Sequence, residues 1–311
     1  MPKIKMKSPA ESLTIRAAFK DYAIHKEALG VKEKTLETYW QQLHAISKHL
    51  DLDMTFAELT KKDLDMMIIS MKRSGLAQNS ISSYVRMLKA YLTWCNSEGF
   101  TRCNLPTYKQ QEVVKGFYTD EELERLLKRP SPDCDFCEYR NWVIINFFLN
   151  CGCRASTVRN MRTQDVSLES RQAVFRHTKT GKVQVIPLCT KMVNILRSYI
   201  SIRGGQDEEP LFCTEQGTMM TEYGLRLAIA KYNKSRGVKK TSLHLFRHTF
   251  ARKYLLDCKG NAFMLQKLLG HSTLKMTRHY CAIYDADIAE NFDQYSPLAQ
   301  MNKTREKLIR K

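Results

Sequence analysis

Apolar residues recur at helical spacing through the first hundred positions of the chain. One run starts at Thr14, and another covers about residues 33–50. The positions that set the spacing are Ile15, Phe19, Tyr22, Leu36, Tyr39, Trp40, Leu43, Ile46, Tyr84, Leu88, Tyr91, Leu92 and Trp94. We interpret the aromatic members of this set as packing in a core rather than stacking on bases, because they lie at core spacing.

Polar residues mark where two further helices of this region begin. Thr60 followed by Asp63 has the form of a capping box, and Asn79 or Ser80 can open a fourth helix. Four such helices predict a compact bundle over residues 13–99. The preceding residues 1–12 hold three lysines and few apolar groups, so we expect a flexible basic lead there.

The helical pattern breaks off over residues 100–116, which contain Gly, Pro and a polar run. We interpret this stretch as a linker between two domains. Thr119 with Glu122 then forms a second capping box, which opens a helix to about Arg129. A strongly apolar helix is expected over about residues 138–150, at the buried centre of the second domain.

A change of period predicts a β-hairpin in the second domain. The segments AVFRHT and KVQVIPL alternate as strands do, and residues 178–181 contain the glycine of the turn between them. Helices are expected at about residues 191–202 and 221–234, which confines strands to one small sheet. The pattern predicts a mainly α chain with a small β-sheet, its mixed α+β domain over residues 117–298 and a basic tail over residues 299–311.

Basic residues clearly outnumber acidic ones. The chain has 50 Lys and Arg against 32 Asp and Glu, a formal charge of +18. This excess favours a nucleic-acid partner whose binding weakens with salt. Cations of the first domain that could touch phosphate are Lys32, Lys34, Lys72, Arg73, Arg86 and Lys89. The start MPKIKMKSPAES lacks the apolar core of a signal peptide and no apolar run could span a bilayer, so we expect a cytoplasmic protein without a membrane partner.

Ten cysteines without regular spacing indicate reduced thiols. Cys134 and Cys137 form a C-x-x-C pair, and Cys151 and Cys153 follow, so zinc binding is one alternative. The two residues inside the pair do not make a zinc-knuckle turn. We therefore interpret these cysteines as small apolar side chains and expect no metal.

Candidate chemistry gathers between Ser242 and Tyr280. His244 and Arg247 are three positions apart, so on a helix they project from one face and can bind one anionic group together. A second helical run, about residues 261–269, is stopped by a glycine, and His271 follows where the chain can turn back. Tyr280 comes nine residues after this histidine.

These motifs resemble the tyrosine recombinase (phage integrase) family. The segments HLFR and LLGHS and the tyrosine nine positions later have the family's order and spacing. Arg154 in CGCRASTVRNMR and Lys179 at the expected hairpin tip occupy the places of two further family residues. The resemblance implies that the first domain is a SAM-like four-helix core-binding domain that clamps DNA, and that the second is a mixed α+β catalytic domain.

The resemblance also assigns a role to each site residue. Tyr280 would attack a DNA phosphodiester, and Arg154 and Arg247 would stabilise the pentavalent phosphate, since guanidinium groups can bind its oxygens in pairs. His244 would bind the phosphate and assist proton removal, His271 would donate to a non-bridging oxygen, and Lys179 would protonate the departing 5′-hydroxyl. The covalent 3′-phosphotyrosyl bond conserves the energy of the phosphodiester, so neither ATP nor another cofactor is expected.

The sequence departs from the family pattern near the first arginine. Thr157 stands where the family often has an acidic residue, and it gives weaker electrostatic support to Arg154. Ser156 or Thr157 is also expected to cap the next helix. The cysteines on either side of the Arg154 turn raise the hypothesis that the enzyme is sensitive to oxidation.

Several alternatives stay open on the sequence alone. Tyr284 also follows His271 and competes with Tyr280 as nucleophile, whereas we interpret His248 and His279 as structural neighbours. The rival activities are a type IB topoisomerase-like relaxation and a catalytically silent DNA-binding regulator. Recombination needs subunit assembly, relaxation does not, and a silent regulator needs no complete set of site residues.

The resemblance finally implies the partners. They are double-stranded DNA with inverted-repeat core sites, three further copies of the chain in a homotetramer on two duplexes joined through a Holliday junction, and an accessory directionality factor. The stretch QYSPLAQ near the end of the chain resembles integrases of mobile elements more than Xer resolvases. We therefore expect integration or excision of a mobile element.

Overall fold

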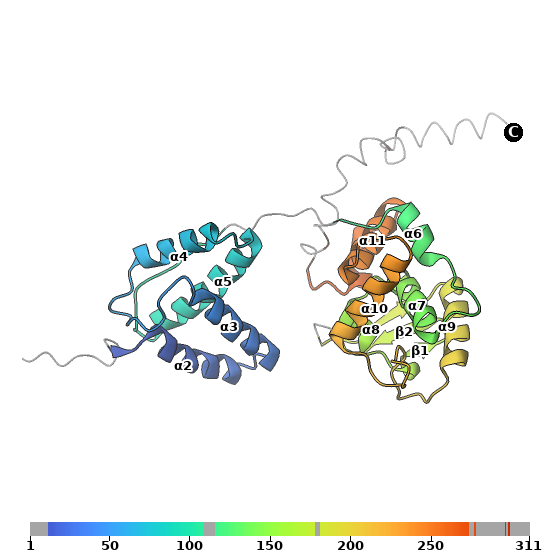
Figure 1. Ribbon diagram of the computed structural model, residues 1–311, viewed down its shortest axis with the longest axis horizontal. Helices are drawn as coiled ribbons and strands as arrows, with labels where there is room; N and C mark the ends of the chain where they lie inside the picture. The colour runs from blue at the N-terminus through green and yellow to red at the C-terminus, as the bar shows by residue number, and fades with distance from the viewer. Residues whose placement is uncertain are drawn as a thin grey trace, which may run out of the picture. The chain divides into compact units, whose positions relative to one another are not determined.

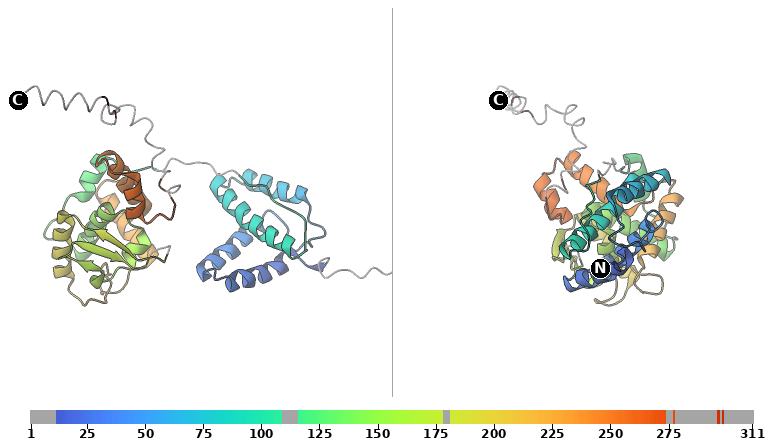
Figure 2. Two further views of the ribbon diagram at one scale, coloured as in Figure 1. Left: turned by 180° about the vertical axis from the view of Figure 1, so that it is seen from behind. Right: turned by 90° about the vertical axis from the view of Figure 1, so that its left-hand side faces the viewer.

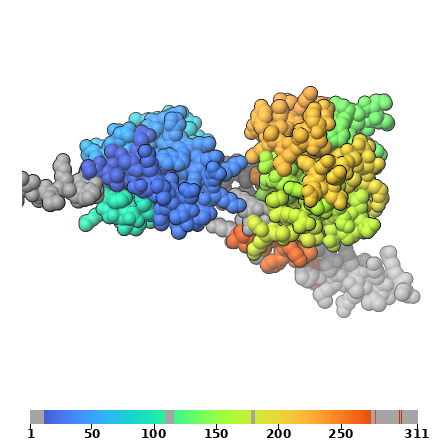
Figure 3. Space-filling view, turned by 90° about the horizontal axis from the view of Figure 1, so that it is seen from below, coloured from blue at the N-terminus to red at the C-terminus, as the bar shows by residue number. Residues whose placement is uncertain are grey.

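A computed structural model describes residues 12–108, 116–177 and 181–273, together with 277, 296 and 298. The chain divides into two compact units, Met1–Val113 and Val114–Lys311. Each unit has its own hydrophobic core. In the space-filling view, the atoms of the first unit are blue to teal and those of the second are green to orange, so neither unit contains residues of the other (Figure 3).

The described part of the first unit is a bundle of helices (Figure 1). Its elements are α2 (Ile15–Ala28), α3 (Glu33–Ile46), α4 (Lys61–Arg73) and α5 (Gln78–Ser97). Helix α5 packs against each of the other three, and α2 also packs against α3. The four-helix prediction is confirmed, although α3 ends at Ile46 rather than near residue 50.

One of the two predicted helix starts in the first unit is confirmed, and the other lies slightly earlier in the chain. Thr60 and Asp63 form the expected reciprocal capping box at α4. Helix α5 begins at Gln78 after Ala77, which makes no side-chain cap, so neither Asn79 nor Ser80 caps it. Both lie inside the first turn, and the Ser80 amide donates to the Ala77 carbonyl at 2.8 Å.

Aromatic side chains fill the core of the first unit. The Tyr91 ring is fully buried, and its hydroxyl donates to the Ile15 carbonyl at 2.6 Å. Trp40 meets Phe19 edge to face at a centroid distance of 4.8 Å and keeps 40% of its surface exposed. The interpretation as core packing therefore holds fully for Tyr91 and only partly for Trp40.

The start of the predicted linker packs on the first unit. Leu105 is buried in the core, and the Lys72 ammonium lies 5.4 Å from the centre of the Tyr108 ring. The first unit therefore reaches into the segment over residues 100–116, and the division between the units also falls inside it.

The second unit is built around α7 (Phe136–Cys151). This helix is buried on nearly every side, and it packs against α6, α9, α10 and α11. A helix that is apolar all round needs such cover, which agrees with the buried centre predicted from the sequence. The other helical elements are α6 (Asp120–Leu127), α8 (Ala155–Arg159), η1 (Thr163–Asp165), α9 (Thr190–Arg203), α10 (Glu222–Ser235), α11 (Leu243–Leu256) and α12 (Ala262–Leu269).

A small antiparallel sheet completes the described part of the second unit (Figure 2). Its order is β1 (Val166–Ser167), β2 (Gln172–Phe175) and β3 (Gln184–Pro187). Strands β2 and β3 form the predicted hairpin, with Phe175 opposite Gln184. Phe175 packs against Phe147 of α7 at a centroid distance of 6.2 Å, which fixes the sheet on the central helix.

The described cysteines are free thiols. Cys151 and Cys153 are buried, and burial raises the pKa of the Cys151 thiol to about 12. A thiol in such surroundings forms little thiolate, so the hypothesis of oxidation sensitivity at these two positions loses its chemical basis. In the described ranges, no helix has the length and apolar character needed to cross a membrane.

Candidate active site

Two of the predicted site residues lie on α11. Arg247 is only 4% exposed, whereas His244, one helical turn earlier, is exposed. The His244 ring meets the His248 ring edge to face at a centroid distance of 5.9 Å. The helix therefore presents one histidine to the surface and anchors one arginine inside the unit.

The Arg247 guanidinium is held by the ends of two other helices. Nη1 donates to the Gly152 carbonyl after α7, and Nη2 donates to the Leu269 carbonyl at the end of α12, both at 2.9 Å. Nη2 also lies 2.8 Å from Nε2 of His271. Carbonyls at helix C-termini carry partial negative charge, so they compensate the burial of this cation.

The position of Gly152 requires both a left-handed backbone and the absence of a side chain. It caps α7 with φ of 59° in the left-handed region. A Cβ at this position would lie 2.3 Å from Cδ1 of Phe250 on α11. Glycine therefore allows the turn to press against α11 and to direct its carbonyl at Arg247.

Arg154 follows this turn at the N-cap position of α8. Its backbone is extended, and its carbonyl accepts from the amides of Thr157 at 3.0 Å and Val158 at 3.2 Å. The expectation that Ser156 or Thr157 caps this helix was wrong, because both lie within it and Thr157 is buried. The Arg154 side chain is partly exposed.

His271 stands where α12 ends. Gly270 turns the chain with φ of 63°, and the His271 amide donates to the Gln266 carbonyl at 3.0 Å. The ring is 9% exposed, and Nδ1 lies 2.9 Å from Oγ1 of Thr277. An arginine can only donate, so Nε2 must accept from Arg247. The ring proton therefore sits on Nδ1 and is donated to the Thr277 hydroxyl.

Burial, together with the positive charges nearby, keeps the His271 ring neutral. Burial, then the charge of Arg247, then that of Arg154 lower its pKa from 6.5 to about 4. The same interactions tell us that the two arginines and this histidine occupy one neighbourhood. Arg247 on α11, His271 just after α12 and Arg154 just before α8 therefore lie in one part of the second unit.

Two of the predicted site residues fall outside the described residues. Lys179 stands in the sequence between β2 and β3, and Tyr280 comes three positions after Thr277. The competing nucleophile Tyr284 and the neighbour His279 also lie outside the described residues.

Sequence reasoning missed four contributors to the site. The carbonyls of Gly152 and Leu269 carry no signature in side-chain type, although the glycine in CGCR marks the first of them. Gln184 on β3 reaches the end of α12, and Thr277 meets His271. These last two contacts depend on tertiary approach, for which the sequence offers no local signal.

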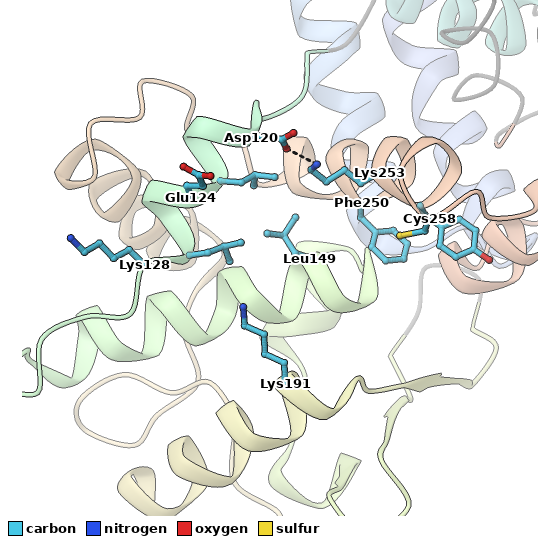
Figure 4. Close-up of a pocket in the computed structure, with 11 residues that line it drawn as sticks. Asp120, Glu124, Lys128, Leu149, Lys191, Phe250, Lys253 and Cys258 are labelled. Carbon is cyan, nitrogen blue, oxygen red and sulfur yellow. Dashed lines mark ion pairs between the residues drawn. The ribbon is translucent and has the colours of Figure 1, made fainter. Parts of the chain in front are cut away.

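A separate pocket of about 800 Å³ lies between α6, α7, α9 and α11 (Figure 4). Apolar side chains such as Leu123 and Leu149 line it, and an ion pair of 2.5 Å joins Asp120 to Lys253 at its rim. It touches the site only through Phe250, whose ring also packs on Gly152. None of the described site residues lines it.

Comparisons with known proteins agree with this geometry. The profile described as "Phage integrase family" matches residues 117–287. The chain is 25% identical to tyrosine recombinase XerC of Thermodesulfovibrio yellowstonii over 276 residues, with 83% of this chain and 91% of the relative covered. It is 27% identical to tyrosine recombinase XerC of Neisseria gonorrhoeae over 288 residues, covering 87% and 92%.

Solved structures share the fold. The Tn1549 transposon integrase in complex with transposon right end DNA matches with a TM-score of 0.75 at 21% identity, covering 91% of this chain and 99% of that one. A lambda integrase tetramer bound to a Holliday junction matches with a TM-score of 0.71 at 19% identity, covering 86% and 77%. The predicted fold class, mainly helical with a small sheet, is confirmed. The profile match spans more than half of the chain, which therefore belongs to the phage integrase family, the tyrosine recombinases that cleave and rejoin DNA.

Proposed function

We propose that Tyr280 of this recombinase attacks a DNA phosphodiester and forms a covalent 3′-phosphotyrosyl intermediate. The observation that carries the proposal is the buried Arg247 guanidinium, fixed by two helix ends beside His271. A cation held in this way before substrate arrives is suited to a phosphate whose charge grows in the transition state.

The step balances with the residues of this chain. The phenolic oxygen of Tyr280 forms a bond to phosphorus while the bond from phosphorus to the 5′-oxygen breaks. His244, exposed on α11, takes the phenolic proton, and Lys179 gives a proton to the departing 5′-oxygen. Attack by a 5′-hydroxyl on the phosphotyrosyl bond reverses the step and reseals a strand.

Arg154, Arg247 and His271 bind the phosphate in this proposal. For His271 to donate to a non-bridging oxygen, its proton must move to Nε2, and Nδ1 must accept from the Thr277 hydroxyl. A hydroxyl can act in either direction, so Thr277 permits both tautomers. Arg247 would then turn the N–H that faces His271 toward the phosphate.

We further propose assembly as a homotetramer on two DNA duplexes with inverted-repeat core sites. The lambda integrase tetramer bound to a Holliday junction supports this, since this chain shares its fold. The Tn1549 transposon integrase supports a mobile-element role in the same way. The relatives named tyrosine recombinase XerC do not bear on that role by their name. We retain the mobile-element role and an accessory directionality factor as parts of the proposal.

The test is recovery of DNA covalently attached to the protein in cells, followed by sequencing. We expect one short, partly palindromic site with the wild type, its loss in Tyr280→Phe and its retention in the matched variant Tyr284→Phe. The opposite pattern would make Tyr284 the nucleophile.

Two other outcomes would replace the proposal. Covalent DNA without any joint product of two sites, together with relaxation of supercoiled plasmid, would indicate topoisomerase-like activity. Absence of covalent DNA in every variant, while ordinary crosslinking still finds the protein on DNA, would indicate a DNA-binding regulator.

A further inference from the structure

The end of α12 is joined to two other elements through its carbonyls. A helix leaves its last four carbonyls without partners inside the helix. Here the carbonyls of Gln266 and Lys267 accept from the main chain at Gly270 and His271. The Leu269 carbonyl accepts from Arg247. The remaining carbonyl, of Leu268, accepts from a side chain of the sheet.

That side chain is Gln184, the first residue of β3. Its Nε2 donates to the Leu268 carbonyl at 2.8 Å and to the Lys267 carbonyl at 2.6 Å. Its Oε1 lies against the turn at Gly270, where a Cβ would approach it to 2.7 Å. The side chain thus fits closely around the turn that leads into His271.

Gln184 and Arg247 therefore cap neighbouring carbonyls of one helix end. Arg247 approaches from α11, and Gln184 approaches from the hairpin. The hairpin itself is short, since β2 and β3 pair over four residues each. Phe175 fixes the base of this small element on α7, and the two hydrogen bonds to α12 constrain the start of β3 relative to the phosphate site.

We propose that Gln184 is a positioning residue, which holds the β2–β3 hairpin against the Arg247–His271 site so that the hairpin can deliver its proton to the leaving group. This rests on the proposed function, in which Lys179, five residues before Gln184, is the general acid. Helix α12 retains Gly270, His271 and Arg247 as donors when Gln184 is replaced, so the phosphate site keeps its shape. The hairpin loses these two hydrogen bonds to α12, while Phe175 still holds its base on α7.

The test uses a leaving group that needs no proton. We would compare single-turnover cleavage of ordinary DNA with cleavage of DNA that carries sulfur in place of the 5′-bridging oxygen, because a thiolate departs unprotonated. The variant is Gln184→Met, which keeps the length of the side chain and removes its donors. The matched control is Gln172→Met, an exposed glutamine of the same sheet.

We expect Gln184→Met to cleave ordinary DNA more slowly by about tenfold or more, since misplacement by about 1 Å costs up to about a hundredfold. On the sulfur substrate its rate should return to within about twofold of the wild type, and Gln172→Met should match the wild type on both substrates. Equal slowing on both substrates would overturn the proposal, because the defect would then lie in the phosphate site or in folding. Unchanged cleavage of ordinary DNA would also overturn it.

The variant Lys179→Ala tests the assignment of the general acid separately from the positioning role of Gln184. Slow cleavage of ordinary DNA and rescue by sulfur supports Lys179 as the general acid. If Lys179→Ala is not rescued while Gln184→Met is, the assignment of the acid fails and the positioning role of Gln184 stands. If both variants stay slow on sulfur, both assignments fail.

Discussion

Arg247 shows how single contacts prepare the site for an anion. The side chain is 4% exposed, and an unpaired charge at such a position would be costly. Two main-chain carbonyls and a neutral imidazole orient its guanidinium group. A cation held in this orientation is suited to the phosphate that the proposed reaction places there.

His271 makes the stability of the second unit depend on pH. Its pKa is lowered to about 4 from 6.5, first by burial and then by the two arginines. The unfolded chain therefore binds this proton more readily than the folded one. The contribution of His271 to the free energy of unfolding is fully present above about pH 6.5, and it is lost as the pH drops from there toward 4. We expect a loss of about 2 kcal/mol from His271 between about pH 7 and pH 5.

Urea unfolding at both pH values measures this contribution. Other groups also titrate, so the quantity of interest is the difference between the wild type and His271→Gln. The variant should lose about 2 kcal/mol less than the wild type on acidification, whereas the exposed His177→Gln should behave as the wild type does. An unchanged pH dependence in His271→Gln would refute the neutral, buried state of the ring.

At the scale of elements, the end of α7 decides whether the site can form. Gly152 combines a left-handed φ of 59° with an approach of 2.3 Å between a hypothetical Cβ and Phe250. Gly152→Ala should therefore displace the Gly152 carbonyl from Arg247. We expect a loss of about 2 to 4 kcal/mol in the free energy of unfolding, of which about 1 kcal/mol is backbone strain, and cleavage slower by about tenfold or more.

Gly237→Ala is the matched control, because Gly237 has φ of 70° and nothing within 4 Å of its Cβ position. Gly237→Ala should lose only the part of the free energy of unfolding that comes from backbone strain, and it should still cleave DNA. The double variant Gly152→Ala with Phe250→Leu should recover part of the stability, since the smaller side chain relieves the clash. If the two alanine variants are equally stable, the contact with Phe250 does not constrain the turn.

Local signals predicted most elements, and they failed where distant segments meet. The capping boxes at Thr60 and Thr119 and the β-hairpin follow from residues a few positions apart, and all are present. The start of α8 was misplaced because Arg154 serves as N-cap without a side-chain hydrogen bond. The motif order grouped Arg247 with His271, and these two side chains lie 2.8 Å apart. The contacts that hold them, such as Gln184 on α12, required the fold itself.

At the scale of the whole molecule, the formal charge of +18 can attract DNA only through the cations that the fold leaves exposed. Lys72 and Lys89 of the first unit contact Tyr108 and Thr107, so part of their role is to hold the segment after α5. Arg73 and Arg86 are exposed. They are therefore better candidates for phosphate contacts than the two lysines, a distinction that the charge pattern alone could not make.

Binding to duplex DNA at increasing salt tests these two arginines. Each phosphate contact contributes about 0.9 to the slope of log K against log salt, so Arg73→Ala and Arg86→Ala should each reduce the slope by about 1 and weaken binding to every sequence alike. Arg16→Ala is the control, because Arg16 is paired with Asp53 at 2.7 Å in the same unit and should leave the slope unchanged. A reduction confined to the specific site would instead indicate base readout, whereas an equal reduction in the control would mean that the net charge of the unit, rather than particular contacts, governs DNA binding.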